Sequence, residues 1–337
     1  MNIKRKINMN KVIVQAIKMA IGGCLSIYIA LLLNLEFAMS AGIITMLTIA
    51  TTKWETLKLS LSRILTFLMS VFILWVIFRY IKSDWIAYGI FILLLVVISE
   101  YLGWRSTISI NAVIGTHFLT THDFSFAFII NEGLLVLIGL SFAILLNLFQ
   151  GTGNQKNRII DDIRDTETKL QEILEALANY LNSNPMGDDV WTDIMVLENK
   201  LETYIERAYE YRNNIFQSHP SYYIHYFEMR MKQCTVLFNL HQEMKKIRNL
   251  PSQAAIIAEY VSYLKEHVVE MNDPKEQMER LKQLSEDMKK QELPVTREEF
   301  ESRAQLYHIL MDLEDFLVFK KRFVDSIDKK QLEIYWK

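Results

Sequence analysis

Apolar residues fill the first half of the chain in long runs separated by short polar turns. A bilayer core about 30 Å thick takes roughly 20 helical residues to cross. Six runs approach that length and predict transmembrane helices at residues 12–33, 37–52, 57–78, 85–102, 107–121 and 126–149. The second and fifth runs are short and polar, so each is either a full span or a broken, partly re-entrant helix.

Beyond residue 153 the apolar positions recur at the three- and four-residue spacing of amphipathic helices. Such series begin at Ile159 and continue near residues 190–211, 221–248, 252–271, 275–291 and 296–327. All five prolines lie in this half and punctuate the series, because proline begins a helix readily but disrupts its interior. The polar, glycine-containing segment 151–157 predicts a linker.

The predicted fold is therefore all-α. A six-helix transmembrane bundle, residues 1–153, precedes a cytoplasmic antiparallel bundle of about five or six helices, residues 154–337. Residues 1–153 carry 11 Lys and Arg against 6 Asp and Glu, a net charge of +5, whereas the remainder has a net charge of −7. Cytoplasmic loops are enriched in basic residues, and with the N-terminus inside only Arg79 and Lys82 fall outside. Both termini are expected in the cytoplasm.

One arginine, Arg63, lies inside the third apolar run, in the segment LSLSRILTFL. Its guanidinium either extends back to the membrane interface at little cost or faces other helices or a wet cavity. Ser60, Arg63, Phe67 and Ser70 recur at helical spacing, with Thr66 adjacent. This polar stripe on an apolar helix favours the second interpretation.

The segment SLSRILTFLMSVFI, with an arginine and a threonine separated by two residues, resembles the signature of the fusaric acid resistance and aromatic acid exporter superfamily. Six apolar segments followed by a helical region resemble its bacterial members that have an aromatic acid exporter C-terminal domain. The resemblance covers essentially the whole chain. It implies efflux of aromatic carboxylates or similar small organic acids across the bacterial plasma membrane, with Arg63 and Thr66 as the residues that match by position.

Four further polar residues in the apolar runs are candidates for binding or translocation. Lys18 in the first run either extends to the interface or shares with Arg63 a cavity for an anionic substrate. Asn111 and His117 lie in the fifth run, and Glu132 lies near the start of the sixth. Coupling to a proton gradient needs a titrating group, which His117 or Glu132 provides unless both are merely interfacial.

Other classes of function find little support in the sequence. Segment 151–157 lacks the Gly-Lys-Ser/Thr ending of a phosphate-binding loop, and the histidines lack metalloprotease spacing. We expect no enzyme, cofactor or metal site, and the net acidity argues against nucleic acid. The aromatic run SYYIHYFEMRMKQC is either a pocket for an aromatic ligand or, as we favour, core with a dimer face.

The sequence therefore predicts a proton-driven exporter of small organic acids whose partners are the substrate, the lipid bilayer and, in a homo-oligomer, further copies of the chain. The alternative is a membrane-anchored helical scaffold or sensor without transport activity. Convergence of Ser60, Arg63, Thr66, Asn111 and His117 around one cavity would favour transport, and their dispersal would favour the scaffold.

Overall fold

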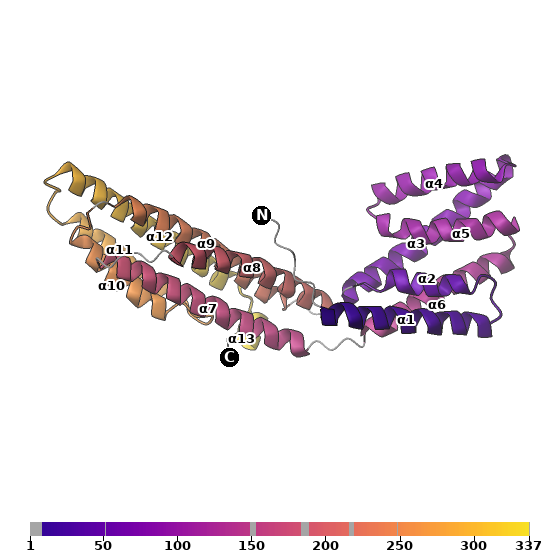
Figure 1. Ribbon diagram of the computed structural model, residues 1–337, viewed down its shortest axis with the longest axis horizontal. Coiled ribbons are helices and arrows are strands. Elements are labelled where there is room, and N and C mark those ends of the chain that lie inside the picture. The colour runs from indigo at the N-terminus through magenta and orange to yellow at the C-terminus, as the bar shows by residue number, and fades with distance from the viewer. Residues whose placement is uncertain are drawn as a thin grey trace. The chain divides into compact units, whose positions relative to one another are not determined.

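The computed structural model describes residues 9–50, 52–148, 153–182, 189–215, 219–247 and 249–336 of the 337-residue chain. These residues form thirteen α-helices and one short 3-10 turn, and none of them is in a strand (Figure 1). The all-helical prediction is confirmed. The chain divides into an N-terminal unit, Met1–Gly151 with Asn213–Ile215, and a C-terminal unit, Thr152–Arg212 with Phe216–Lys337.

The N-terminal unit has a helix at each of the six apolar runs. They are α1 (Met9–Leu32), α2 (Met39–Thr48), α3 (Lys53–Tyr80), α4 (Asp84–Tyr101), α5 (Ile108–Thr121) and α6 (Phe126–Leu148), with the turn η1 (Arg105–Thr107) preceding α5. Within the described residues, α1, α3, α4 and α6 are long and apolar enough to cross a membrane. With 10 and 14 residues, α2 and α5 rise only about 15 and 21 Å. Six complete crossings therefore stay a prediction.

The short helix α2 packs against α1 and α6 and also contacts α3 and α5. Glycine makes this close packing possible. A Cβ atom on Gly139 of α6 would lie 2.6 Å from Cγ2 of Ile44 and 2.9 Å from the backbone oxygen of Ala41. The helix is therefore held tightly inside the bundle. An apolar core that includes Phe67, Phe91 and Phe118 fills the space among the surrounding helices.

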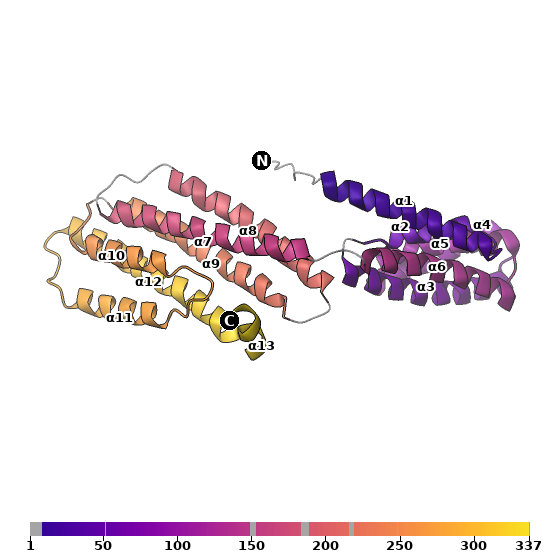
Figure 2. The ribbon, with the colours of Figure 1, turned by 90° about the horizontal axis from the view of Figure 1, so that it is seen from below.

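The C-terminal unit contains seven helices (Figure 2). They are α7 (Gly153–Leu181), α8 (Asp189–Asn214), α9 (Ser221–Lys246), α10 (Gln253–Glu266), α11 (Lys275–Lys289), α12 (Arg297–Ser326) and α13 (Lys329–Tyr335). Helix α12 packs along α9, α10 packs along α7, and α7 contacts α9. Pro220 and Pro274 stand directly before α9 and α11, as the proline pattern predicts.

One local prediction for this unit is wrong, and one short helix was missed. Residues 153–157 were predicted to belong to a linker, but they form the first turn of α7. The short helix α13 was not predicted at all. Asp328 begins it with a capping box, in which its side chain accepts from the backbone N–H of Gln331 and the Gln331 side chain accepts from the backbone N–H of Asp328.

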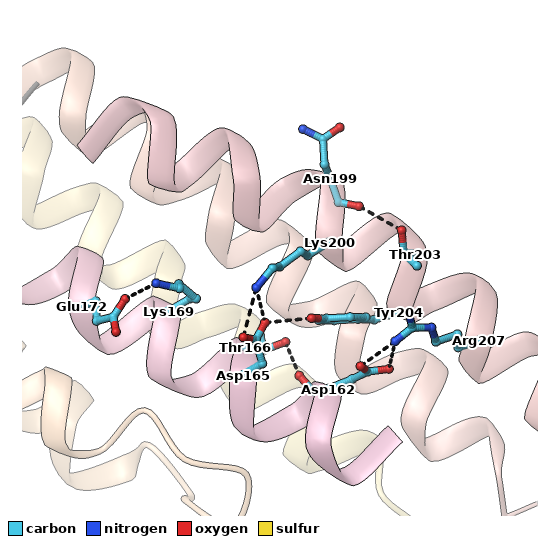
Figure 3. Close-up of polar contacts among 10 residues, drawn as sticks. All are labelled: Asp162, Asp165, Thr166, Lys169, Glu172, Asn199, Lys200, Thr203, Tyr204 and Arg207. Atoms are coloured by element: carbon cyan, nitrogen blue, oxygen red, sulfur yellow. Dashed lines mark hydrogen bonds and ion pairs between the residues drawn. The ribbon is translucent and has the colours of Figure 1, made fainter. Parts of the chain in front are cut away.

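Helices α7 and α8 are joined by a ladder of ion pairs (Figure 3). Nη1 of Arg207 donates to both carboxylate oxygens of Asp162 at 2.7 and 2.9 Å. Asp165 accepts from Nζ of Lys200 at 2.8 Å and from the Tyr204 hydroxyl at 2.7 Å. Burial alone raises the pKa of the Asp165 carboxyl, but these two hydrogen bonds outweigh it and hold the pKa below its usual value.

Candidate functional site

The Arg63 side chain lies inside the N-terminal unit at the C-terminal end of α2, and only 2% of it is exposed. Its Nη1 donates to the Thr48 hydroxyl and to the backbone oxygen of Ile44, and its Nη2 donates to the backbone oxygens of Leu47 at 2.9 Å and Ser106 at 3.4 Å. The last carbonyls of a helix lack partners within it and carry partial negative charge. Arg63 therefore caps α2 and does not extend to the surface.

The cation at Arg63 has no anionic partner among the described residues. All four of its acceptors are neutral oxygens, and its Nε has no hydrogen-bond partner. A buried charge is costly unless it is paired, and helix-end carbonyls offset only part of that cost. The buried guanidinium therefore keeps one N–H donor without a partner.

The polar stripe on α3 faces the interior of the bundle. Ser60, Thr66, Phe67 and Ser70 are all buried together with Arg63. The hydroxyls of Ser60 and Thr66 donate to backbone oxygens one turn earlier, each at 2.7 Å. The Ser70 hydroxyl is buried without a partner. Helix α3 as a whole packs against α4, α5 and α6.

His117 and Glu132 form a buried pair. Nδ1 of His117 lies 2.7 Å from Oε2 of Glu132, and its Nε2 lies 3.1 Å from the Ser40 hydroxyl. The exposed fractions are 6% for His117 and 0% for Glu132. Helix α6 begins at Phe126, so Glu132 lies about 9 Å along it. Both side chains are therefore buried inside the N-terminal unit.

The turn between α1 and α2 covers this pair. The Phe37 ring stacks on the His117 ring, with centroids 4.0 Å apart and planes 7° apart, and the Phe37 backbone is left-handed, with φ 55°. The Asn131 side chain bonds both to Oε1 of Glu132 at 3.2 Å and to the backbone N–H and C=O of Glu36. The carboxylate and the turn are therefore linked through one amide.

The two charged clusters contact opposite ends of α2. Ser40 bonds to His117 near its first turn and Thr48 bonds to Arg63 at its last residue, about 12 Å apart along the helix. On α5, Asn111 lies between Ser106 and His117. It is fully buried, its Nδ2 donates to the backbone oxygen of Thr107, and its Oδ1 has no partner. The polar residues thus gather inside one bundle as two clusters.

Sequence analysis identified the charged members of both clusters but not Ser40, Phe37, Asn131 and Thr48. Their residue types carry no signal, since serine, threonine and phenylalanine are ordinary in apolar helices. Lys18 lies on α1 and is half-buried. Its pairing with Arg63 stays a prediction.

The fold and the buried charged clusters define a multi-pass helical membrane protein, and sequence comparison identifies the family. Residues 10–150 match the model of aromatic acid exporter family member 1, and residues 156–321 match that of the putative aromatic acid exporter C-terminal domain. The chain belongs to the aromatic acid exporter family, as the resemblance predicted. Its place in an exporter family supports membrane transport.

Two similar proteins illustrate the match. The chain is 30% identical over 326 residues to the uncharacterized protein YqjA of Bacillus subtilis (strain 168), covering 96% of this chain and 100% of that one. A crystal structure of a putative membrane protein from Clostridium difficile 630 is 25% identical and covers 50% of this chain and 98% of its own, with a TM-score of 0.45.

Proposed function

We propose that this protein exports small aromatic carboxylates, or similar organic anions, from the cytoplasm across the bacterial plasma membrane, driven by the proton gradient. Both termini are cytoplasmic in this proposal. Arg63 receives the anion, with Thr66, Asn111 and Lys18 lining its route, and the His117–Glu132 pair exchanges protons. Membership of the exporter family supports transport of a small molecule, and the chemistry of the two clusters supports the rest.

The main observation behind the proposal is that the Arg63 guanidinium is buried without an anionic partner among the described residues. The guanidinium is 2% exposed, bonds only to neutral oxygens and keeps an unpaired Nε–H. A planar guanidinium matches a carboxylate in shape and charge, and the pair is strong in a low-dielectric interior. An incoming carboxylate would supply the negative charge that the surrounding residues lack.

The His117–Glu132 pair supplies the second half of the cycle. An imidazole and a carboxylate 2.7 Å apart are close enough for a proton to pass between them. Because the Ser40 and Thr48 contacts attach the two clusters to opposite ends of α2, a small shift of α2 changes both together. Proton uptake at one end then favours release of the anion at the other.

The test is transport by the full-length chain reconstituted in liposomes, with radiolabelled benzoate and an imposed pH gradient. Arg63→Gln is expected to abolish export. Arg63→Lys keeps the positive charge but loses the planar guanidinium that can bind a carboxylate through two hydrogen bonds, so partial export is expected. Arg79→Gln, an exposed arginine in the last turn of the same helix, is the matched control and should leave export unchanged.

Because Arg63 also caps α2, the thermal midpoint of each variant in detergent is measured alongside export. Unchanged export by a folded Arg63→Gln variant would exclude the role of Arg63. Wild-type liposomes that move no organic anion at all would replace the proposal with the scaffold or sensor.

A further inference from the structure

A groove of about 260 Å³ lies between α9 and α12, which run side by side in the C-terminal unit (Figure 1). Its floor is aromatic. Phe323 is buried and packs against the rings of Tyr222 and Tyr226, with centroids 5.4 and 5.8 Å away. Phe319, one turn earlier on α12, is half-buried and lines the groove. A flat apolar ligand would contact the half-buried Phe319 ring and the small exposed part of Phe323.

Two cations stand at the rim without carboxylate partners. Lys232 on α9 and Arg322 on α12 are exposed, and neither forms an ion pair within the described part of the chain. Nζ of Lys232 instead lies 5.8 Å from the centroid of the Phe319 ring. The neighbouring Lys321, by contrast, is paired with Asp325. Positive charge is therefore available beside an aromatic surface.

The net charge of the groove stays positive when the other charged and titratable groups that line it are included. Glu228 contributes one carboxylate, and the Tyr209 hydroxyl donates to it at 3.3 Å. His225, exposed on α9, adds positive charge whenever it is protonated. With Lys232 and Arg322 against Glu228, the net charge is positive at neutral pH.

We infer that this groove binds a small aromatic carboxylate, with the ring against Phe319 and Phe323 and the carboxylate between Arg322 and Lys232. Arg322 and Lys232 both line the groove, where either cation can form a charge-assisted hydrogen bond with a carboxylate, and the aromatic side chains favour a flat ring. The volume is below the roughly 300–1,000 Å³ typical of ligand pockets, so only a small, single-ring acid suits it.

The identity of the ligand as the exported compound rests on the proposed function. On that basis, the C-terminal unit is a receptor for the substrate of the membrane unit. The aromatic run SYYIHYFEMRMKQC, part of α9, then contributes to the core with one face of the helix and to the groove with the other. Its buried tyrosines belong to the core, and its exposed His225 and Lys232 face the groove.

The test is calorimetric titration of the full-length, detergent-solubilised chain with benzoate. The Arg63→Gln variant is the background for every titration, so the proposed membrane site does not contribute. Benzoate is expected to bind, while cyclohexanecarboxylate, which lacks the aromatic ring, and benzyl alcohol, which lacks the charge, bind at least several-fold more weakly. Equal affinity for all three compounds would overturn the inference.

Variants of the groove complete the test. Arg322→Gln and Lys232→Gln are each expected to weaken benzoate binding about tenfold or more, because each removes a hydrogen bond to a charged group. The matched controls are Arg297→Gln on α12 and Lys246→Gln on α9, which lie outside the groove and should bind as tightly as the parent. Binding that survives both groove substitutions would refute the site.

The two proposals fail separately. Groove binding without any export by wild-type liposomes would leave the groove in place and remove the exporter mechanism. Export that depends on Arg63, with no benzoate binding in the Arg63→Gln background, would support the exporter mechanism and refute the groove.

Discussion

The imidazole of His117 on α5 and the carboxylate of Glu132 on α6 lie 2.7 Å apart with almost no exposed surface. Burial of a carboxylate is costly unless a polar partner reaches it; here Asn131 donates to Oε1, and Nδ1 of His117 lies 2.7 Å from Oε2. The other contacts of the pair are the Ser40 hydroxyl, the Asn131 amide and the Phe37 ring.

The first prediction concerns the carboxylate of this pair. Glu132→Gln keeps the shape of the side chain but removes the group that takes up the proton. Export is expected to lose its response to an imposed pH gradient, a loss of about 5–150-fold, which is the usual range of coupling between two sites. The measurement is the initial rate of benzoate export from liposomes with and without the gradient.

Glu36→Gln is the matched control. Glu36 is exposed in the turn beside this pair, and its contacts with Asn131 use only backbone atoms. The control should respond to the gradient as the parent does. A Glu132→Gln protein with the parent's response would show that the pair has no part in coupling.

The second prediction concerns the close approach of α2 and α6. In Gly139→Ala the new methyl group would lie 2.6 Å from Cγ2 of Ile44 and 2.9 Å from a backbone oxygen that cannot rotate away. We expect a loss of about 1–3 kcal/mol of stability, the usual cost of overpacking. The measurement is the thermal midpoint of the detergent-solubilised chain.

Gly89→Ala on α4 provides the comparison, since nothing lies within 4 Å of its Cβ position. Alanine is the better helix former, so this variant should be as stable as the parent or more stable by about 0.5–1 kcal/mol. If both variants had the same midpoint, the packing of α2 against Gly139 would be looser than described.

Most of the helices could be predicted from the sequence. In the N-terminal unit their apolar runs approach the length of a membrane span, and in the C-terminal unit their apolar positions follow the helical period and prolines separate them. The extent of α2 could not. The apolar run continues past Thr48, but the helix stops there, where Arg63 from another helix bonds to the Thr48 hydroxyl and to the backbone oxygens of Ile44 and Leu47. Because Arg63 is distant in sequence from Thr48, the apolar pattern around residue 48 does not predict this helix end.

The linker prediction failed for a related reason. Residues 153–157 have the polar, glycine-containing composition of a flexible segment, yet they form the first turn of α7. Helix formation is cooperative, so the long amphipathic series that follows can extend over a first turn of low intrinsic propensity. Composition alone does not contain that information.

For the candidate site, the sequence revealed the charges and not their partners. Arg63, His117 and Glu132 stand out because an ionisable residue inside an apolar run needs an explanation. Ser40 and Phe37 do not stand out in the sequence. They contact His117 only because the fold packs α2 and the turn before it against α5. The sequence also did not reveal that Arg63 and His117 contact opposite ends of one short helix.

The third prediction concerns a buried cation in the C-terminal unit. Arg230 is 1% exposed, and its guanidinium donates to Tyr226, to Gln233 at 2.8 Å and to Glu167 at 3.4 Å. Arg230→Ala leaves Glu167 without its cation and opens a cavity. The expected cost is about 3–5 kcal/mol in the free energy of unfolding, measured in urea by circular dichroism.

Arg230→Met is expected to lose less than Arg230→Ala, because the methionine refills much of the volume. Arg297→Ala is the surface control. Its ion pair with Glu301 is exposed, so its removal should change the unfolding free energy by less than about 1 kcal/mol. Equal losses at the buried and surface positions would mean that Arg230 is accessible to water.

The fourth prediction concerns Asp312 on α12. Partial burial, together with the nearby carboxylates of Glu243 and Asp315, raises the pKa of Asp312 to about 6. An unfolded aspartate has a pKa near 3.9. Between about pH 4 and 6 the folded chain therefore binds more protons at this position than the unfolded chain. The stabilising contribution is fully present below about pH 4 and is lost as the pH rises to 6.

Asp312→Asn removes this titration and the repulsion from Glu243. The variant is expected to be more stable than the parent at pH 7.5, and the difference should shrink as the pH falls from 6 to 4. The measurement is the urea midpoint of the detergent-solubilised chain at each pH. Glu314→Gln, an exposed residue on the same helix, should follow the parent at every pH. If Asp312→Asn also ran parallel to the parent, Asp312 would titrate normally, and its burial could not be the cause of any pH dependence.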